Sequence, residues 1–264
     1  MMKNINTFNE MKSKNAKIAM ITAYDFVQAQ IAEEAEIDII LVGDSLATTI
    51  QGKENTLPVT VEEMIYHTEL VRRGAKNSFI VSDMPFMSYQ LDEKEALKNA
   101  GRFVKESGAN AVKIEGGINI KHTIEKITGA GIPVISHIGL MPQFINTMGG
   151  YKVQGRLESE IEKLVFAASE LEKAGSFMIV LEAMPENAAD AVRHAVKIPT
   201  IGIGAGRYTD GQVLVFHDAV GMLSSKPPKF VKKYADTRAI MAKALSEFKN
   251  EVKNNIFPSP DNIY

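Results

Sequence analysis

The 264-residue sequence contains no cysteine. This absence excludes disulfide bonds, thiolate catalysis and zinc sites built from cysteine, and it fits a reducing cytoplasm. Neither sign of charge is in large excess, because 30 Lys and Arg stand against 32 Asp and Glu, for a net charge of −2. A balanced chain gives no electrostatic reason to expect nucleic acid or an anionic membrane as a partner.

Long apolar runs are also missing. Nowhere do about 18 apolar residues stand together, the length that a transmembrane helix needs. The first twenty residues are polar and rich in Lys, without the apolar core of a signal peptide. With 45% apolar and 23% charged residues, the composition is that of a globular protein with a sizeable core. We therefore expect a cytoplasmic protein.

Short runs rich in Ile and Val alternate along the chain with longer amphipathic segments. The eight runs are 17–22, 38–43, 78–83, 111–116, 133–139, 177–183, 199–205 and 212–218. They are mostly apolar on both faces, which is typical of strands that are covered on both sides.

The segments between the runs carry helix signals. Thr60 stands three residues before Glu63, the spacing of a capping box, and Gly74, Gly108 and Gly175 lie at the ends of three helical patterns. Strands alternating with helices predict an α/β fold, and eight strands favour a (β/α)8 TIM barrel. An open doubly wound sheet remains an alternative, because periodicity does not reveal closure.

We expect one domain over residues 1–264. From about residue 225 a C-terminal helical extension follows the barrel, since "SSKPPKF" should interrupt regular structure before a Lys-rich helix over about 229–252. The Gly-rich "GIGAG" at 202–206 lacks the spacing of a dinucleotide- or phosphate-binding loop. We interpret it as the turn after the seventh strand.

Polar residues end most of the apolar runs. They are Asp44 and Ser45 after the second run, Ser82 and Asp83 in the third, Lys113 and Glu115 in the fourth, Ser136 and His137 in the fifth, Glu182 in the sixth, and His217 and Asp218 in the eighth. The carboxyl ends of barrel strands share one face, where active sites are built. So many ionisable residues at one face predict an active site there.

Each residue also has a structural explanation. Asp44 and Asp83 could cap the helices that follow them. Lys113 and Glu115, two residues apart and so on one face of a strand, could form an ion pair inside the barrel. His137 could be a core histidine hydrogen-bonded to the backbone.

Glu182 is the residue that capping explains least, because an apolar strand precedes it and Ala-Met-Pro follows. Converging carboxylates without Cys or clustered His favour a hard cation such as Mg²⁺ or Mn²⁺ over zinc. With Glu182 as a base and Lys113 as a cation, such a site could remove a proton next to a carbonyl group. These residue types do not identify the substrate.

Motifs along nearly the whole chain carry a resemblance to a known family. They are, in order, "ITAYDF", "VGDSL", "SDMPFMSY", "VKIEGG", "HIGLMPQ", "GGYKVQG", "LEAMP" and "IGIGAG" with "DGQVLVFHDAVGM". With them the chain resembles the ketopantoate hydroxymethyltransferase family, which is similar to the phosphoenolpyruvate mutase and isocitrate lyase group of barrels. Met141 stands where members often have Thr, and the loop 207–211 also differs from other members' versions.

The resemblance implies an enzyme of pantothenate biosynthesis. It would transfer a hydroxymethyl group from 5,10-methylenetetrahydrofolate to the keto acid 3-methyl-2-oxobutanoate, giving 2-dehydropantoate through a Mg²⁺-stabilised enolate. Bacterial members are typically homodecamers, so the resemblance also implies a homo-oligomer.

The resemblance implies a role for each site residue as well. Asp44 and Asp83, with Glu115 directly or through water, would hold Mg²⁺. Ser45, Lys113 and His137 would bind the keto acid beside the two aspartates, and Glu182 would be the catalytic base.

Two other function classes are weighed against this one. A carbon–carbon or carbon–phosphorus lyase or mutase of the related barrels is the second enzyme class, and those we considered use a reactive Cys or a phosphonate-binding loop. A non-catalytic ligand-binding barrel is the third. The sequence leaves open the choice among Mg²⁺, Mn²⁺ and Co²⁺, the folate contacts and the role of His217 and Asp218.

Overall fold

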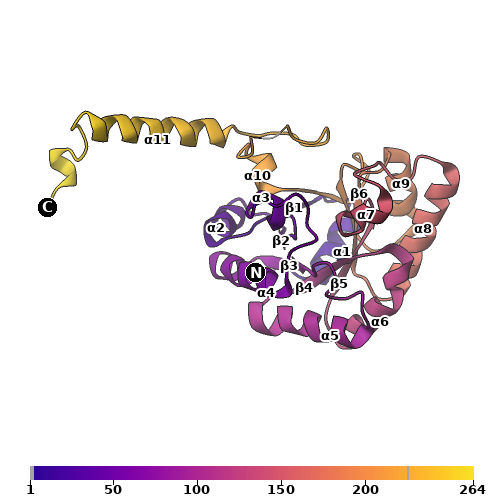
Figure 1. Cartoon of the computed structure of the whole chain (residues 1–264). Coiled ribbons are helices and arrows are strands. Elements are labelled where there is room, and N and C mark those ends of the chain that lie inside the picture. Colours follow the sequence, from indigo (N-terminus) through magenta and orange to yellow (C-terminus); the bar gives the residue numbers. More distant parts are fainter. Residues whose placement is uncertain (1–2, 225) are drawn as a thin grey trace. The chain divides into compact units, whose positions relative to one another are not determined.

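Parallel pairing of the first and last strands closes the sheet. Strand β1 (Ile18–Thr22) hydrogen-bonds on one side to β2 (Ile39–Val42) and on the other to β8 (Gly211–Leu214). The remaining strands are β3 (Phe79–Asp83), β4 (Ala111–Glu115), β5 (Val134–Gly139), β6 (Met178–Glu182) and β7 (Thr200–Ile203). All eight are parallel and follow each other around the barrel in chain order (Figure 1). The expected TIM barrel is confirmed, and closure excludes the open sheet.

This computed structural model describes residues 3–224 and 226–264. Around the strands lie α2 (Phe26–Glu34), α3 (Leu46–Thr49), α4 (Val61–Gly74), α5 (Glu93–Arg102) with a π-helical turn (Phe103–Ser107), α6 (Lys121–Gly129), α7 (Ile145–Met148), α8 (Glu158–Lys173) and α9 (Glu186–Ala195). The Thr60–Glu63 capping box begins α4, and α4 ends at Gly74, as the sequence predicted. No helix in these two ranges is long and apolar enough to cross a bilayer.

The barrel interior is apolar at the amino ends of the strands and charged at their carboxyl ends. Alternate residues of each strand face inward, so Ala111 of β4 belongs to the interior apolar cluster while Lys113 and Glu115 continue the same face towards the carboxyl end. The cluster also contains Ile39, Phe79, Ile135, Met178 and Ile201. The fold therefore places its apolar packing beneath its polar residues.

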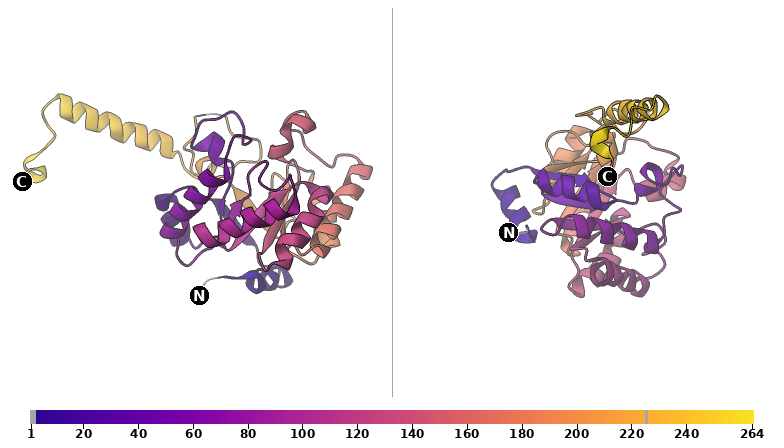
Figure 2. Two further views of the ribbon diagram at one scale, coloured as in Figure 1. Left: turned by 60° about the horizontal axis from the view of Figure 1, so that its bottom comes forward. Right: turned by 90° about the vertical axis from the view of Figure 1, so that its left-hand side faces the viewer.

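Helix α1 (Ile5–Ser13) closes the amino end of the barrel (Figure 2). Its Phe8 is fully buried and packs edge-on against Phe79, at the start of β3, with 5.1 Å between ring centroids. Lys12 Nζ donates to the carbonyl oxygens of Val196 and Ile198, which lie just before β7. With this end closed, the other end of the barrel is left for ligands.

Two sequence predictions near the C-terminus are wrong. We expected an eighth strand over 212–218, but β8 ends at Leu214, and His217 and Asp218 lie in the short helix α10 (Phe216–Ala219). They therefore do not stand at a strand end with the other polar residues. The helix expected over about 229–252 is α11 (Thr237–Lys253), because the Pro-containing stretch delays its start until Asp236 caps it.

The chain forms two compact units, Met1–Val215 with the barrel and Phe216–Tyr264 with α10 and α11. The expected start of the extension, at about residue 225, falls on a residue outside the described ranges. The Gly-rich segment 202–206 begins inside β7, which ends at Ile203, so only residues 204–206 form the predicted turn, where Gly204 and Gly206 have positive φ angles.

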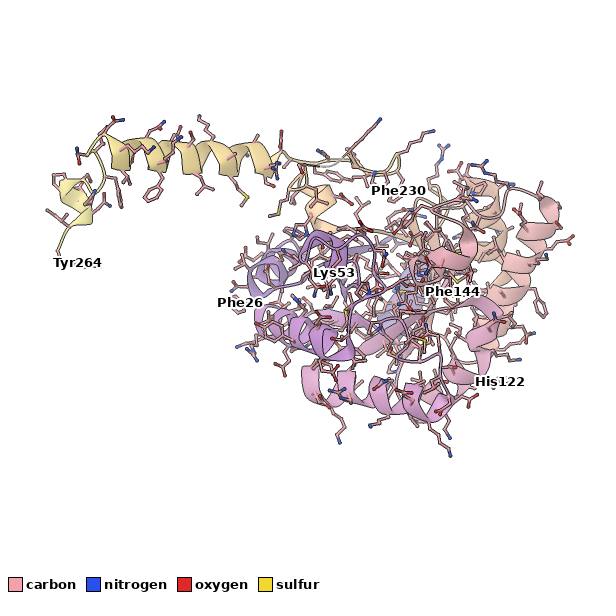
Figure 3. All side chains as sticks on the ribbon, in the orientation of Figure 1. Phe26, Lys53, His122, Phe144, Phe230 and Tyr264 are labelled. Atoms are coloured by element: carbon pink, nitrogen blue, oxygen red, sulfur yellow. The ribbon has the colours of Figure 1, made fainter. Side chains whose placement is uncertain are left out.

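Phe8→Ala tests the closure of the barrel by α1. The substitution leaves a cavity against Phe79, so we expect the free energy of unfolding in urea to fall by about 3–5 kcal/mol. Phe26→Ala is the matched control, since Phe26 is 43% exposed on the outer side of α2 (Figure 3). Equal losses in the two variants would contradict the closing role of α1.

Candidate active site

Strand register brings the predicted polar residues together at the carboxyl end of the barrel. Asp83 pairs with Lys113 on the next strand, and Glu115 pairs with His137 on the strand after that. Glu182 ends β6, where it is paired with Gly139 of β5. Asp44 and Ser45 follow directly after β2 and the intervening Gly43.

Asp44 and Asp83 point into this cluster and do not cap helices. The backbone N–H of Asp44 donates to Asp83 Oδ2 at 3.1 Å, and Asp44 Oδ2 accepts from the side-chain amide of Gln143 at 3.0 Å. The N-cap position of α3 is Ser45, without a side-chain cap bond, and Asp92 caps the next helix after Asp83. The structure therefore does not support the capping alternative for either aspartate.

Lys113 is buried and forms its ion pair with Asp83 across the two strands. Its Nζ lies 2.7 Å from Asp83 Oδ1, with both side chains about 5% exposed. The structural ion pair considered for Lys113 was with Glu115, and the partner found is Asp83.

His137 lies between two glutamates. Its Nε2 is 3.3 Å from Glu182 Oε2, and its Nδ1 is 3.8 Å from Glu115 Oε1. The ring is buried, whereas 17% of the Glu182 side chain is exposed. Glu182 is therefore the carboxylate of the cluster that a ligand entering from this end can reach most directly.

Ser45 is held by a buried tyrosine. Its Oγ lies 2.8 Å from Tyr24 Oη. The preceding Gly43 allows this close arrangement, because a Cβ atom at that position would lie 2.7 Å from Ser45 Oγ. The hydroxyl of Ser45, the residue next to Asp44 in the chain, is thus held by Tyr24.

Crowding of carboxylates changes their acidity. Burial raises the pKa of Asp44 to about 7, and the nearby charge of Asp83 adds to the rise. Burial likewise raises the pKa of Glu115 well above its usual range. For Lys113 burial opposes the charged form, but the charges of the neighbouring carboxylates, Asp83 first, outweigh it and raise the pKa. The cluster holds more negative charge than one ammonium group balances.

The donor set fits a hard divalent cation. In the described residues, no three His, Asp or Glu side chains form a complete metal-binding group. Mg²⁺ does not require one, because it commonly takes only one or two protein carboxylates and completes its shell with water and substrate oxygens. Asp44 and Asp83 are buried carboxylates next to each other, so they are the residues that would hold the cation. Glu115 lies near them, and its charge raises the pKa of the neighbouring Tyr89.

Sequence reasoning missed three residues of this site. They are Tyr24, Tyr89 and Gln143, which hydrogen-bond to the predicted residues. All three stand in the motifs "ITAYDF", "SDMPFMSY" and "HIGLMPQ", so the motifs were the available signal. None is ionisable at a strand end, which was the pattern used to find the others.

A closed barrel with an apolar base and a cluster of acids, Lys and His at its carboxyl end defines an enzyme of the TIM-barrel class. The family model described as ketopantoate hydroxymethyltransferase matches residues 2–260. The chain belongs to this family.

Curated relatives resemble the chain over nearly its full length. The protein named 3-methyl-2-oxobutanoate hydroxymethyltransferase from Thermotoga neapolitana is 52% identical, with 99% of this chain and 96% of the relative covered. Proteins of the same name from Clostridium beijerinckii and Enterococcus faecalis are 50% and 51% identical, covering 100% and 97% of this chain and 96% and 93% of their own lengths. The resemblance seen in the motifs is thus confirmed.

Solved structures of low sequence identity share the fold. A phosphonopyruvate hydrolase in complex with oxalate and Mg²⁺ has a TM-score of 0.62 at 11% identity, with 100% of this chain and 92% of that chain covered. A 2,3-dimethylmalate lyase of the PEP mutase/isocitrate lyase superfamily has a TM-score of 0.60 at 15% identity, covering 98% and 90%. The chain therefore shares the fold of these proteins, as expected.

Asp44→Asn tests the carboxylate crowding. A folded pKa of about 7 against 3.8 means that the charged carboxylate destabilises the metal-free fold, and that this cost grows from about pH 4 and is complete above about pH 7. At pH 8 we expect the metal-free variant to be more stable than wild type by on the order of 1 kcal/mol.

Urea unfolding at pH 5 and pH 8, with and without Mg²⁺, measures the effect. Mg²⁺ should stabilise wild type and not Asp44→Asn. The control is Asp190→Asn, a half-exposed aspartate on α9. A variant that is less stable than this control at pH 8, or that Mg²⁺ stabilises as much as wild type, would contradict the interpretation.

Proposed function

We propose that this chain transfers the hydroxymethyl group of 5,10-methylenetetrahydrofolate to 3-methyl-2-oxobutanoate, giving 2-dehydropantoate and tetrahydrofolate. This would be the first step of pantothenate biosynthesis. The observation that carries the proposal is that the carboxylates of the site differ in their burial. Asp44, Asp83 and Glu115 are buried and bonded within the cluster, whereas Glu182 is partly exposed beside His137. A site of this kind combines cation-binding acids with an accessible base.

Asp44 and Asp83 are the proposed ligands of Mg²⁺, with Glu115 acting directly or through water. Bound Mg²⁺ would serve as a Lewis acid for the oxygens of the α-keto acid and lower the energy of the negative charge that develops during proton removal. The excess of carboxylates over Lys113 supports a cation at this place, because it would relieve the repulsion that raises the pKa of Asp44.

Glu182 is the proposed catalytic base. It would remove the proton from C3 of the keto acid and leave the bonding electrons as an enolate. His137 Nε2 lies 3.3 Å from Glu182 Oε2, so the imidazole can hold the carboxylate in place or receive a hydrogen bond from it once it is protonated. Leu140 N–H also donates to the backbone oxygen of Glu182 at 2.9 Å, which fixes the end of β6.

Ser45 and Lys113 are the proposed binding groups for the keto acid. The Ser45 hydroxyl, oriented by Tyr24, can donate to a carboxylate oxygen. The Lys113 ammonium places positive charge beside Asp83, where an anionic substrate would need it. His137 would form part of the pocket wall.

Carbon–carbon bond formation completes the proposed reaction. C3 of the enolate attacks the one-carbon unit of the folate, the bonds from that carbon to the folate nitrogens break, and one water supplies the hydroxyl oxygen of the product. Glu182 holds the proton taken from C3 and can pass it to one folate nitrogen, while the proton that the water loses goes to the other. The atoms then balance without a redox step.

A lyase or mutase activity, of the kind named for the structural neighbours, is less well supported. The neighbours named as a 2,3-dimethylmalate lyase and a phosphoenolpyruvate phosphomutase each share the fold at 15% identity, whereas the relatives named as hydroxymethyltransferases share about half of the sequence. A non-catalytic barrel would not need an accessible glutamate beside a buried histidine.

We further propose that the protein acts in the cytoplasm as a homo-oligomer, a homodecamer by family resemblance. Helix α11 supports an oligomer, because Met241, Leu245, Phe248 and Val252 recur on one face and are each about half exposed or more. Such a face requires a cover in solution, and a second copy of the chain would provide one.

A coupled assay tests the function directly. The purified protein is mixed with the keto acid and 5,10-methylenetetrahydrofolate, and 2-dehydropantoate is measured with Mg²⁺ and with excess chelator. We expect product only with the metal. Absence of product with metal present would reject the proposed reaction, and equal rates with the chelator would reject the metal.

Glu182→Gln should separate binding from proton removal. The amide keeps the shape of the side chain but cannot accept the C3 proton, so exchange of that proton into heavy water should fall by at least about 10²-fold. Mg²⁺ and keto-acid affinities should change little. NMR follows the exchange, with Glu34→Gln, an exposed residue of α2, as control. Exchange at the wild-type rate would exclude Glu182 as the base.

A further inference from the structure

Gln143 connects the acids of the site although it lies on no barrel strand. It is buried in the 3₁₀ turn Pro142–Phe144 that follows β5, a turn located in Figure 3 by the label of Phe144. Its backbone N–H donates to Glu115 Oε2 at 3.2 Å, and its side-chain Nε2 donates to Asp44 Oδ2 at 3.0 Å. One residue thus holds two carboxylates that come from opposite sides of β3.

The surroundings of the Gln143 amide permit only one orientation. Its second Nε2 hydrogen points to the carbonyl oxygen of Met84 at 2.9 Å, so both hydrogens face acceptors. Its Oε1 accepts from Tyr89 Oη at 2.7 Å and lies 3.3 Å from Gln90 Nε2, which are donors. A flipped amide would set oxygen against two oxygens, and we therefore assign the NH₂ group to Asp44.

Tyr89 links the Gln143 side chain to the backbone of Glu115. Its buried hydroxyl lies 2.8 Å from the backbone oxygen of Glu115 and receives the Glu115 N–H at 3.2 Å, besides its contact with Gln143. Burial raises the pKa of Tyr89 well above its usual range, with the Glu115 charge next in effect, so the hydroxyl keeps its proton as a donor. The end of β4 and the Gln143 turn are thus joined at one oxygen.

We propose that Gln143, oriented by Tyr89, is a positioning residue that determines which oxygens of Asp44 and Glu115 remain free for the cation and its water. The amide occupies Asp44 Oδ2 and the backbone N–H occupies Glu115 Oε2, so Asp44 Oδ1 and Glu115 Oε1 remain. A neutral donor stabilises the ionised form of Asp44 without adding a positive charge that would compete with the metal. This inference rests on the proposed metal-dependent function and adds a residue pair to it.

Gln143→Met tests the side chain with little change of volume. It removes the amide bonds but keeps the backbone N–H to Glu115, so the fold of the turn is largely retained. Hydrogen-bond partners of metal ligands typically contribute 10–100-fold to metal affinity, and we expect a loss of about that size for Mg²⁺ in calorimetric titration. The control is Gln30→Met, at an exposed position of α2, which should bind Mg²⁺ as wild type does.

A double-mutant cycle distinguishes positioning from a purely structural role. Tyr89→Phe should weaken Mg²⁺ binding in the otherwise wild-type protein and should weaken it less in the Gln143→Met background, because part of its effect acts through the Gln143 amide and the rest through the Glu115 backbone. Tyr66→Phe, at an exposed tyrosine of α4, is the matched control. Independent, additive losses from Gln143 and Tyr89 would overturn the proposed coupling.

Thermal unfolding without metal and steady-state kinetics supply the remaining readouts. A merely structural Gln143 would lower the midpoint temperature while leaving the Mg²⁺ affinity of the folded protein unchanged, and that result overturns the inference. At saturating Mg²⁺ the variant should recover most of its kcat, because the base Glu182 is untouched. If wild type itself fails to bind Mg²⁺, the proposed function fails as well, whereas equal binding by wild type and Gln143→Met rejects only the role of Gln143.

Discussion

The ion pair between Lys113 and Asp83 is the interaction on which the site depends. It places one ammonium group among Asp44, Asp83 and Glu115 in a buried position. Without it, the acids would be unpaired charges in a region of low dielectric, which is a costly arrangement. With it, negative charge still exceeds positive charge. The pair therefore lets these acids be buried in the fold, and their remaining negative charge is the basis of the proposed cation site.

The barrel makes this concentration of charge possible. Its lower interior is filled with apolar side chains and closed by Phe8 of α1, so the polar layer is confined to the carboxyl end. Parallel register then sets Asp83 beside Lys113 and Glu115 beside His137. The stabilising apolar packing and the destabilising carboxylates are thus spatially separated, and crowding at one end does not disrupt the packing at the other.

Polar residues at strand ends were a reliable signal where the strand itself was correctly predicted. Asp44, Asp83, Lys113, Glu115, His137 and Glu182 lie where that pattern placed them. His217 and Asp218 do not, because the apolar run continues past the end of β8 at Leu214 into the short helix α10. Apolar composition alone does not distinguish a strand from a short helix. Gln143 escaped notice for a related reason, since it is uncharged and lies in a turn.

The sequence by itself determined the alternation of strands and helices, the family and the chemical types of residue at the strand ends. These follow from local patterns, because hydrophobic period and capping residues act over a few positions. Only the tertiary structure decided the partners: Lys113 with Asp83 instead of Glu115, Ser45 with Tyr24, and Asp44 with Gln143, which is 99 positions away in the chain. Such contacts depend on barrel closure and strand register. These are properties of the whole sheet, so they cannot be read from the sequence around any single residue.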